Sequence, residues 1–135
     1  MKNESGFSLI ELLLVVVIIG LIAALAVPSL QRGIRAAENG SAFSTMRTIS
    51  SEQVGFFVKQ NRFGRVTEIN DTLRVGTSVG DRVIRGRYTF EMNPIEPSDE
   101  ELRNEYTVVA TSSHPDGEIY KYELNQTGTI TQILP

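Results

Sequence analysis

Apolar and polar positions divide this chain into three parts with different periods. Residues 7–27 are almost wholly apolar and hold one charged side chain, Glu11. As an α-helix this stretch would be roughly 30 Å long, which is enough to cross the hydrocarbon core of a bilayer. The pattern therefore predicts a membrane-spanning helix that extends to Pro28.

Residues 29–60 are amphipathic, because their apolar positions recur at spacings of three or four or at sums of these. The apolar positions are Leu30, Ile34, Ala37, Ala42, Met46, Ile49 and Phe56. This pattern predicts that the same helix continues beyond the membrane and lays one face on a globular head. Three glycines weaken this helix, each by up to about 1 kcal/mol relative to alanine. We expect the helix to end near residues 61–64.

The rest of the chain, residues 61–135, changes to the period of two and the β-branched runs that are typical of strands. Four strands are expected, at 88–92, 106–111, 119–124 and 129–133. Asn125 and Gly128 suit a short hairpin between the last two. In the less regular segment 62–87, the pattern allows short edge strands near 73–75 and 83–84. The predicted fold class is α+β, a long N-terminal helix packed on a small antiparallel sheet of about four strands.

Composition fits one small domain plus one membrane segment, because the chain has 135 residues, 41% of them hydrophobic, and a net charge of −3. Neither charge sign is in large excess, so no nucleic acid is predicted as a direct partner. The absence of cysteine excludes a disulfide scaffold and thiolate metal sites. We predict no cofactor and no phosphate-binding loop.

The head offers little candidate chemistry. Carboxylates in the loop 93–105 have the ligand type that Ca²⁺ takes, but their spacing matches no EF-hand, and a short helical turn capped by Ser98 is favoured. The single histidine, His114, precedes Pro-Asp-Gly and follows two serines. Adjacent Ser, His and Asp residues rarely reach triad geometry, so we predict a turn whose side chains point to solvent. We therefore expect a protein that is not an enzyme.

Glu11 is the most informative residue of the apolar stretch. A carboxylate inside an apolar span costs on the order of 2.5–3.5 kcal/mol, and no cation within the span can pair with it. A cut between Gly6 and Phe7 would create an amine one turn away. That amine could pair with Glu11 of its own chain or of a neighbour staggered by one turn, and such a pair would set the register between subunits.

Small residues give the predicted span a candidate packing face. Gly20 and Ala24 are four residues apart, with Pro28 on the same face, and small residues let helices approach closely in an apolar medium. Glycine and alanine are also simply common in membrane helices, which leaves both interpretations open. Pro28 removes a backbone donor to Ala24 and should kink or loosen the helix locally.

A short polar leader ending in Gly6, then Phe7, an embedded Glu11 and Pro28 together resemble the N-terminal signature of type IV pilins and of the pseudopilins of type II secretion. The resemblance covers residues 6–30. It implies that a prepilin peptidase cuts after Gly6 on the cytoplasmic side and N-methylates Phe7. It also implies that Glu11 guides docking into a helical filament.

The resemblance implies a domain organisation: a leader at 1–6 that is removed, a transmembrane and filament-core helix at 7–28, an amphipathic helix at 29–60 and a head at 61–135. It also implies an inner-membrane protein with one span and its head outside the cytoplasm, which later enters a surface pilus or a periplasmic pseudopilus. Its partners would be the lipid bilayer, the prepilin peptidase, an inner-membrane assembly platform, and copies of itself and related minor pilins.

Three functional interpretations remain at this point. The favoured one is a structural prepilin of a type IV pilus-type filament, because the chain lacks the Pro- and Gly-rich loop and the Ca²⁺-linked C-terminal region of major pseudopilins. A pseudopilin of a type II secretion system is the alternative. The third is a membrane-anchored monomeric binding domain, in which residues 7–27 are an ordinary signal anchor and Glu11 is a stray charge.

Overall fold

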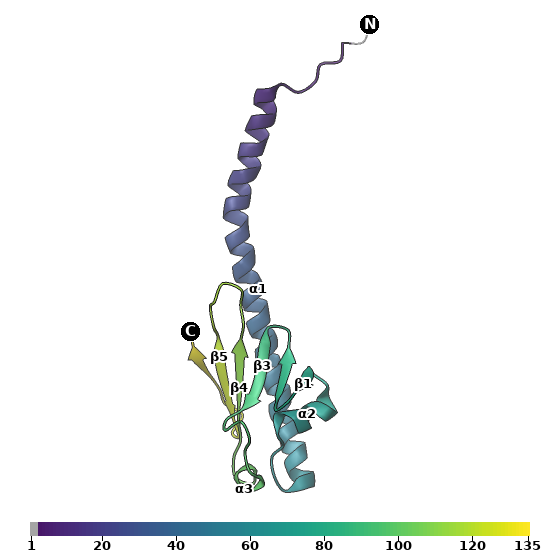
Figure 1. Cartoon of the computed structure of the whole chain (residues 1–135), viewed down its shortest axis with the longest axis vertical. Coiled ribbons are helices and arrows are strands. Elements are labelled where there is room, and N and C mark those ends of the chain that lie inside the picture. The colour runs from purple at the N-terminus through teal and green to yellow at the C-terminus, as the bar shows by residue number, and fades with distance from the viewer. Residues whose placement is uncertain (1–2) are drawn as a thin grey trace. The chain divides into compact units, whose positions relative to one another are not determined.

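A computed structural model describes residues 3–135 of the chain (Figure 1). In order, its elements are α1 (Leu9–Gln60), α2 (Val66–Leu73), β1 (Thr77–Val79), β2 (Arg82–Arg85), β3 (Tyr88–Met92), α3 (Asp99–Leu102), β4 (Thr107–Ser112), β5 (Lys121–Asn125) and β6 (Ile130–Leu134). The chain forms two compact units, of which the first ends at Ala37 and the second is Glu38–Pro135. A long N-terminal helix and an antiparallel sheet confirm the predicted α+β class.

The helix α1 runs for 52 residues without a break, through its glycines and through Pro28. It ends at Gln60, close to the predicted end. Asn61 terminates the helix, because it takes a left-handed conformation with φ of 56° and its N–H donates to the Phe57 carbonyl at 2.8 Å. The buried positions of α1 are Ala42, Thr45, Met46, Ile49 and Gln53. Leu30 and Ile34 stay 66% and 49% exposed, so the face that joins the core begins later than the apolar pattern predicted.

The sheet has six strands in the order of the chain, and each strand pairs antiparallel with the next. The four predicted strands lie within two residues of their expected bounds, as β3 to β6. The expected edge strand near 83–84 is β2. The edge strand expected near 73–75 was wrong: Leu73 ends α2, and the edge strand β1 begins at Thr77.

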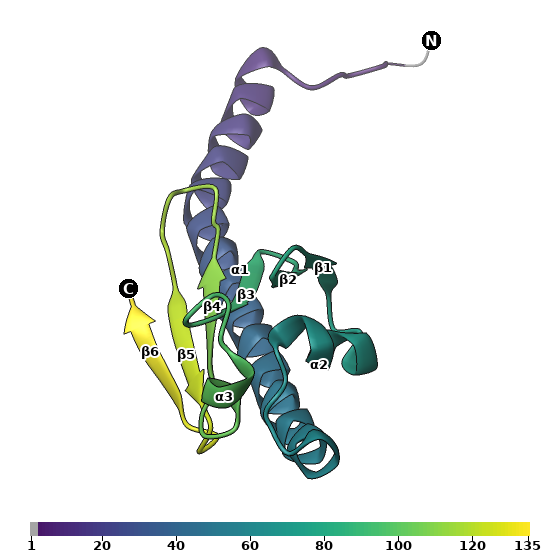
Figure 2. The same cartoon turned by 60° about the horizontal axis from the view of Figure 1, so that its bottom comes forward.

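The core of the second unit lies between α1 and one face of the sheet, and Figure 2 shows the part of α1 after Ala37 running behind the strands. Strand β3 alternates buried and half-buried positions, with Phe90 buried at its centre. Phe90 pairs with Ala110, which pairs with Tyr122 on the next strand. Met46 and Ile49 join these residues in one apolar cluster. The helix and the strands therefore bury their apolar faces in one shared core.

Polar contacts fix the connection between α1 and α2. The buried side chain of Gln53 donates to the Gly64 carbonyl at 2.8 Å and accepts from the Gly64 N–H at 2.7 Å. Nearby, Arg62 and Arg65 both contact the carboxylate of Glu68. Burial alone would raise the pKa of Glu68, but hydrogen bonds from Arg62 and from the Arg65 backbone outweigh it and lower the pKa.

The segment after β3 contains the predicted capped turn. Ser98 accepts from the N–H of Glu101, and the Glu101 carboxylate accepts from the N–H of Ser98 at 2.8 Å, which forms a capping box at the start of α3. Asp99 instead pairs with Arg65 at 2.9 Å. Asp99 and Glu101, two of the loop carboxylates considered for Ca²⁺, are thus engaged in holding this turn and joining it to the start of α2.

Candidate functional site

The predicted cleavage position lies in a segment without regular secondary structure that precedes α1. Gly6 and Phe7 are exposed, and the side chain of Phe7 is 81% exposed. Apart from the two chain neighbours of Gly6, no described residue has an atom within 4 Å of the position that a Cβ on Gly6 would occupy. The peptide bond between these two residues is therefore open to an enzyme that approaches from solution.

Glu11 lies in the first turn of α1, where its carboxylate forms a capping box with Ser8. The backbone N–H of Ser8 donates to Glu11 Oε2 at 2.8 Å, and the N–H of Glu11 donates to Ser8 Oγ at 3.3 Å. This box satisfies two of the N–H groups that a helix leaves unpaired at its start, and the negative charge favours the positive end of the helix dipole.

Ser8 is a residue that the analysis of the sequence missed. The signal was present, because Ser8-x-x-Glu11 before an apolar run is the pattern of a capping box. The box occupies one oxygen of Glu11. Within residues 3–135, Oε1 of Glu11 has no hydrogen-bond partner, so that oxygen stays available to another group.

The other two predicted assembly residues, Gly20 and Pro28, lie inside α1. No side chain lies within 4 Å of the position that a Cβ on Gly20 would take. Residues on both sides of Pro28 keep the helical assignment. The face that carries Gly20, Ala24 and Pro28 is therefore exposed in the chain by itself.

The apolar part of α1 is long and apolar enough to cross a membrane, by length and composition. Its most apolar window of 18 residues has a mean hydropathy of 3.1, and none of that window is buried. Among residues 3–135, α1 is the one helix with this property. This observation agrees with the membrane-spanning helix predicted from the sequence.

His114 behaves differently from the prediction that its side chain points to solvent. The turn is present, since the Gly117 N–H donates to the His114 carbonyl at 3.1 Å, but the imidazole is only 3% exposed. Its Nδ1 lies 3.3 Å from Oε2 of Glu38, and its ring packs edge-on against Tyr120. Ser112 Oγ accepts from the Tyr120 N–H. The fold thus turns the histidine toward Glu38 of α1.

Comparison with known proteins bears on the N-terminal site. Residues 1–27 match the model of the prokaryotic N-terminal methylation motif. The chain carries the N-terminal signature of type IV pilins and pseudopilins. A similar protein is the type IV major pilin protein PilA of Myxococcus xanthus (strain DK1622), which is 33% identical over 82 residues. The matched region is 60% of this chain but 37% of that pilin's length.

The pilin-like signature and the exposed apolar helix both indicate the same kind of N-terminal segment. They agree with a pilin-type or pseudopilin-type N-terminal segment, and the apolar helix is long enough to anchor the chain in a membrane. The family with this signature consists of structural subunits. The fold adds the position of each N-terminal residue: an accessible Gly6–Phe7 bond before the helix, and Glu11 within its first turn.

Proposed function

We propose that this chain is a prepilin, a structural and non-enzymatic subunit of a type IV pilus-type filament. The observation that carries the proposal is the methylation motif at residues 1–27, joined to a helix whose apolar residues the chain itself leaves uncovered. The similarity to a major pilin favours a pilus over a pseudopilus. A pseudopilin of a type II secretion system and a membrane-anchored monomeric binding domain are the alternatives that the experiments below separate.

The first step is removal of the leader. A prepilin peptidase cleaves between Gly6 and Phe7 on the cytoplasmic side and N-methylates Phe7. The exposure of both residues before α1 supports this step, because the bond can enter an active site without unwinding the helix. Cleavage leaves the Ser8 N–H in place, so the capping box with Glu11 survives in the mature chain.

The second step is docking of the new amine. Oε2 of Glu11 is held by Ser8, whereas Oε1 is available to the Phe7 amine of the same chain or of a neighbouring copy. At about 4 Å and an effective dielectric near 20, the attraction is on the order of 4 kcal/mol before desolvation is subtracted. Because a buried pair gains little net stability, its main contribution is the register between subunits.

The third step moves the helix from lipid into a bundle. Before assembly the chain spans the inner membrane once, with its head outside the cytoplasm and in contact with an assembly platform. In the filament, the face of Gly20 and Pro28 packs on the helices of other copies and of minor pilins. Van der Waals contacts between small residues replace contacts with lipid tails.

N-terminal mass spectrometry on protein sheared from the surface of the native host tests the processing steps. A chain that begins at methylated Phe7 in the sheared, sedimentable fraction would support a pilin. The same processed chain found only in the periplasm and membranes would favour the pseudopilin. A monomeric chain that still begins at Met1 would overturn both and leave an anchored binding domain.

Two substitutions at Glu11 separate its charge from its capping role. Glu11→Ala removes both, whereas Glu11→Gln removes the charge and keeps a side chain that can complete the box. If the pair with the amine guides docking, both variants are expressed at normal levels and neither forms filaments, as counted by electron microscopy. Normal filament numbers from Glu11→Gln would show that capping, not charge, is what assembly requires.

A further inference from the structure

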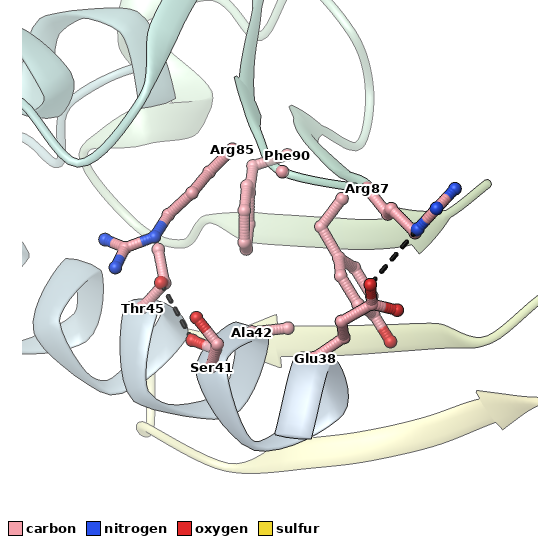
Figure 3. Close-up of a pocket in the computed structure, with 9 residues that line it drawn as sticks. Glu38, Ser41, Ala42, Thr45, Arg85, Arg87 and Phe90 are labelled. Atoms are coloured by element: carbon pink, nitrogen blue, oxygen red, sulfur yellow. Dashed lines mark hydrogen bonds and ion pairs between the residues drawn. The ribbon is translucent and has the colours of Figure 1, made fainter. Parts of the chain in front are cut away.

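A cavity of about 310 Å³ lies in the head between α1 and the turn that joins β2 to β3. The helix lines it with Glu38, Ser41, Ala42 and Thr45, the end of β2 adds Arg85, and the turn adds Arg87. Figure 3 shows the two arginines extending in opposite directions from the turn, with Ser41 and Ala42 below and between them. All of these residues belong to the second compact unit.

Arg85 is the last residue of β2, and it lines the cavity while remaining exposed. Strand residues alternate between the faces of a sheet, so Arg85 shares the helix-facing side of β2 with the fully buried Val83. Its cross-strand partner is the buried Tyr88. Since Arg85 is itself exposed, its guanidinium is hydrated and accessible to a ligand that enters the cavity from solvent.

Arg85 makes no ion pair with a carboxylate among residues 3–135. Nη1 of Arg85 donates one hydrogen bond to the Val75 carbonyl at 3.3 Å, which uses one of the five donors of a guanidinium. The carboxylate of the cavity is engaged elsewhere: Glu38 Oε1 accepts from Arg87 Nε at 3.1 Å, and Oε2 faces His114. One carboxylate against two guanidinium groups leaves the lining with a formal charge of +1.

Ser41 supplies a second donor beside Arg85. Its carbonyl accepts from the Thr45 hydroxyl at 2.9 Å, but within the described part of the chain its own hydroxyl makes no hydrogen bond. Ser41 is exposed, whereas Ala42 behind it is buried and apolar. The cavity therefore combines an uncompensated cation, a free hydroxyl and an apolar floor.

We propose that this cavity binds a compact anion with a carboxylate or phosphate head. Arg85 pairs with the head, the Ser41 hydroxyl donates to it, and the floor at Ala42 accepts a short apolar or hydroxylated remainder. Charge-assisted hydrogen bonds from a guanidinium to these heads are roughly twice as strong as hydrogen bonds between neutral groups. The volume suits a small molecule, since ligand pockets begin near this size.

The test is a titration of the full-length, monomeric chain in a nonionic detergent at low salt, followed by amide chemical shifts in NMR spectra. The probes are inorganic phosphate and propionate, added separately. Saturable shifts at Ser41 and Gly86 with either probe are expected. Working with the monomer ensures that no carboxylate of another copy fills the cavity.

Arg85→Gln is expected to weaken binding about tenfold, as loss of a charged hydrogen-bonding partner does. The matched control is Arg82→Gln, which removes the same charge from the same strand on the opposite face, where Arg82 lies across from Glu91. Ser41→Ala should weaken binding by a smaller factor with unchanged tyrosine fluorescence. Shifts that do not saturate, or equal weakening by Arg85→Gln and Arg82→Gln, would overturn the proposal.

Discussion

The first and second parts of α1 have the same helical backbone, but their side chains have different surroundings. From Asn3 to Ile34 every described residue is exposed, although the helical part of this stretch is the most apolar of the chain. After Ala37, fewer apolar residues are present, yet Ala42, Met46 and Ile49 are at most 3% exposed. Apolar composition therefore does not by itself predict burial within the chain. The first part needs lipid or other helices to cover it, whereas the second is covered by its own sheet.

The largest expected difference in stability lies between truncating a buried side chain of the head and truncating an exposed side chain in the apolar part of α1. Phe90→Ala is expected to lower the free energy of unfolding of the head by about 3–5 kcal/mol, because it removes a ring that is 1% exposed at the centre of the core. Leu13→Ala, at a side chain that is 63% exposed, should leave that free energy unchanged.

Tyrosine fluorescence during urea unfolding of the full chain in detergent measures both variants. All four tyrosines lie in the head and the chain has no tryptophan, so the signal reports on the head alone. Equal losses from Phe90→Ala and Leu13→Ala would mean that the exposed part of α1 contributes to the stability of the head.

A smaller effect is expected from the buried polar contact at the end of α1. Gln53→Leu keeps a similar volume but leaves the N–H and the carbonyl of Gly64 without partners, which should cost about 3 kcal/mol. Gln60→Leu, at the exposed last residue of α1, is the matched control and should cost nothing measurable in the same urea experiment. If Gln53→Leu lowered the free energy of unfolding no more than an ordinary surface substitution does, water would be replacing the lost contacts.

The smallest effect concerns the ion pairs between Arg62, Arg65 and Glu68. Because the folded state lowers the pKa of Glu68 below its ordinary value of 4.5, the contribution is present above that pH and is lost as the pH falls through the folded-state pKa. Glu68→Gln should therefore cost less than about 1 kcal/mol at pH 7, since the pairs are partly exposed, and this cost should shrink as the pH falls below 4.5.

Urea unfolding at a series of pH values measures this difference. Glu105→Gln is the control, because Glu105 is exposed and its carboxylate makes no ion pair within residues 3–135. A difference between Glu68→Gln and the native chain that persists in acid would mean that packing, not charge, is what Glu68 contributes.

Local patterns predicted α1 and the strands β3 to β6, because their periods of 3.6 and two extend over enough residues to be recognised. The same reasoning missed α2, whose eight residues make only two turns. Its buried residues Val66 and Ile69 are spaced as a helix requires, but the segment is too short to distinguish this spacing from chance. The misplaced edge strand near 73–75 follows from that miss, because α2 extends to Leu73.

The residues of the candidate sites also differ in whether local sequence patterns could reveal them. The signature residues Gly6, Phe7 and Glu11 could be predicted from the sequence, because the pattern that singles them out is a spacing along one segment. The capping role of Ser8 was equally local, and the Ser-x-x-Glu pattern could have revealed it. His114 and Arg85 could not have been placed from local patterns, because the groups they face or lack come from other elements.

The sequence by itself determined which segments form the long helix and the main strands, and where the pilin-like signature lies. Those properties depend on neighbours within a few residues, so period and spacing are sufficient. Only the tertiary structure decided which part of α1 joins the core, that His114 turns inward to Glu38, and that Arg85 faces a cavity without a carboxylate partner among residues 3–135. These features depend on contacts between residues far apart in the chain, and strand register and helix packing set those contacts.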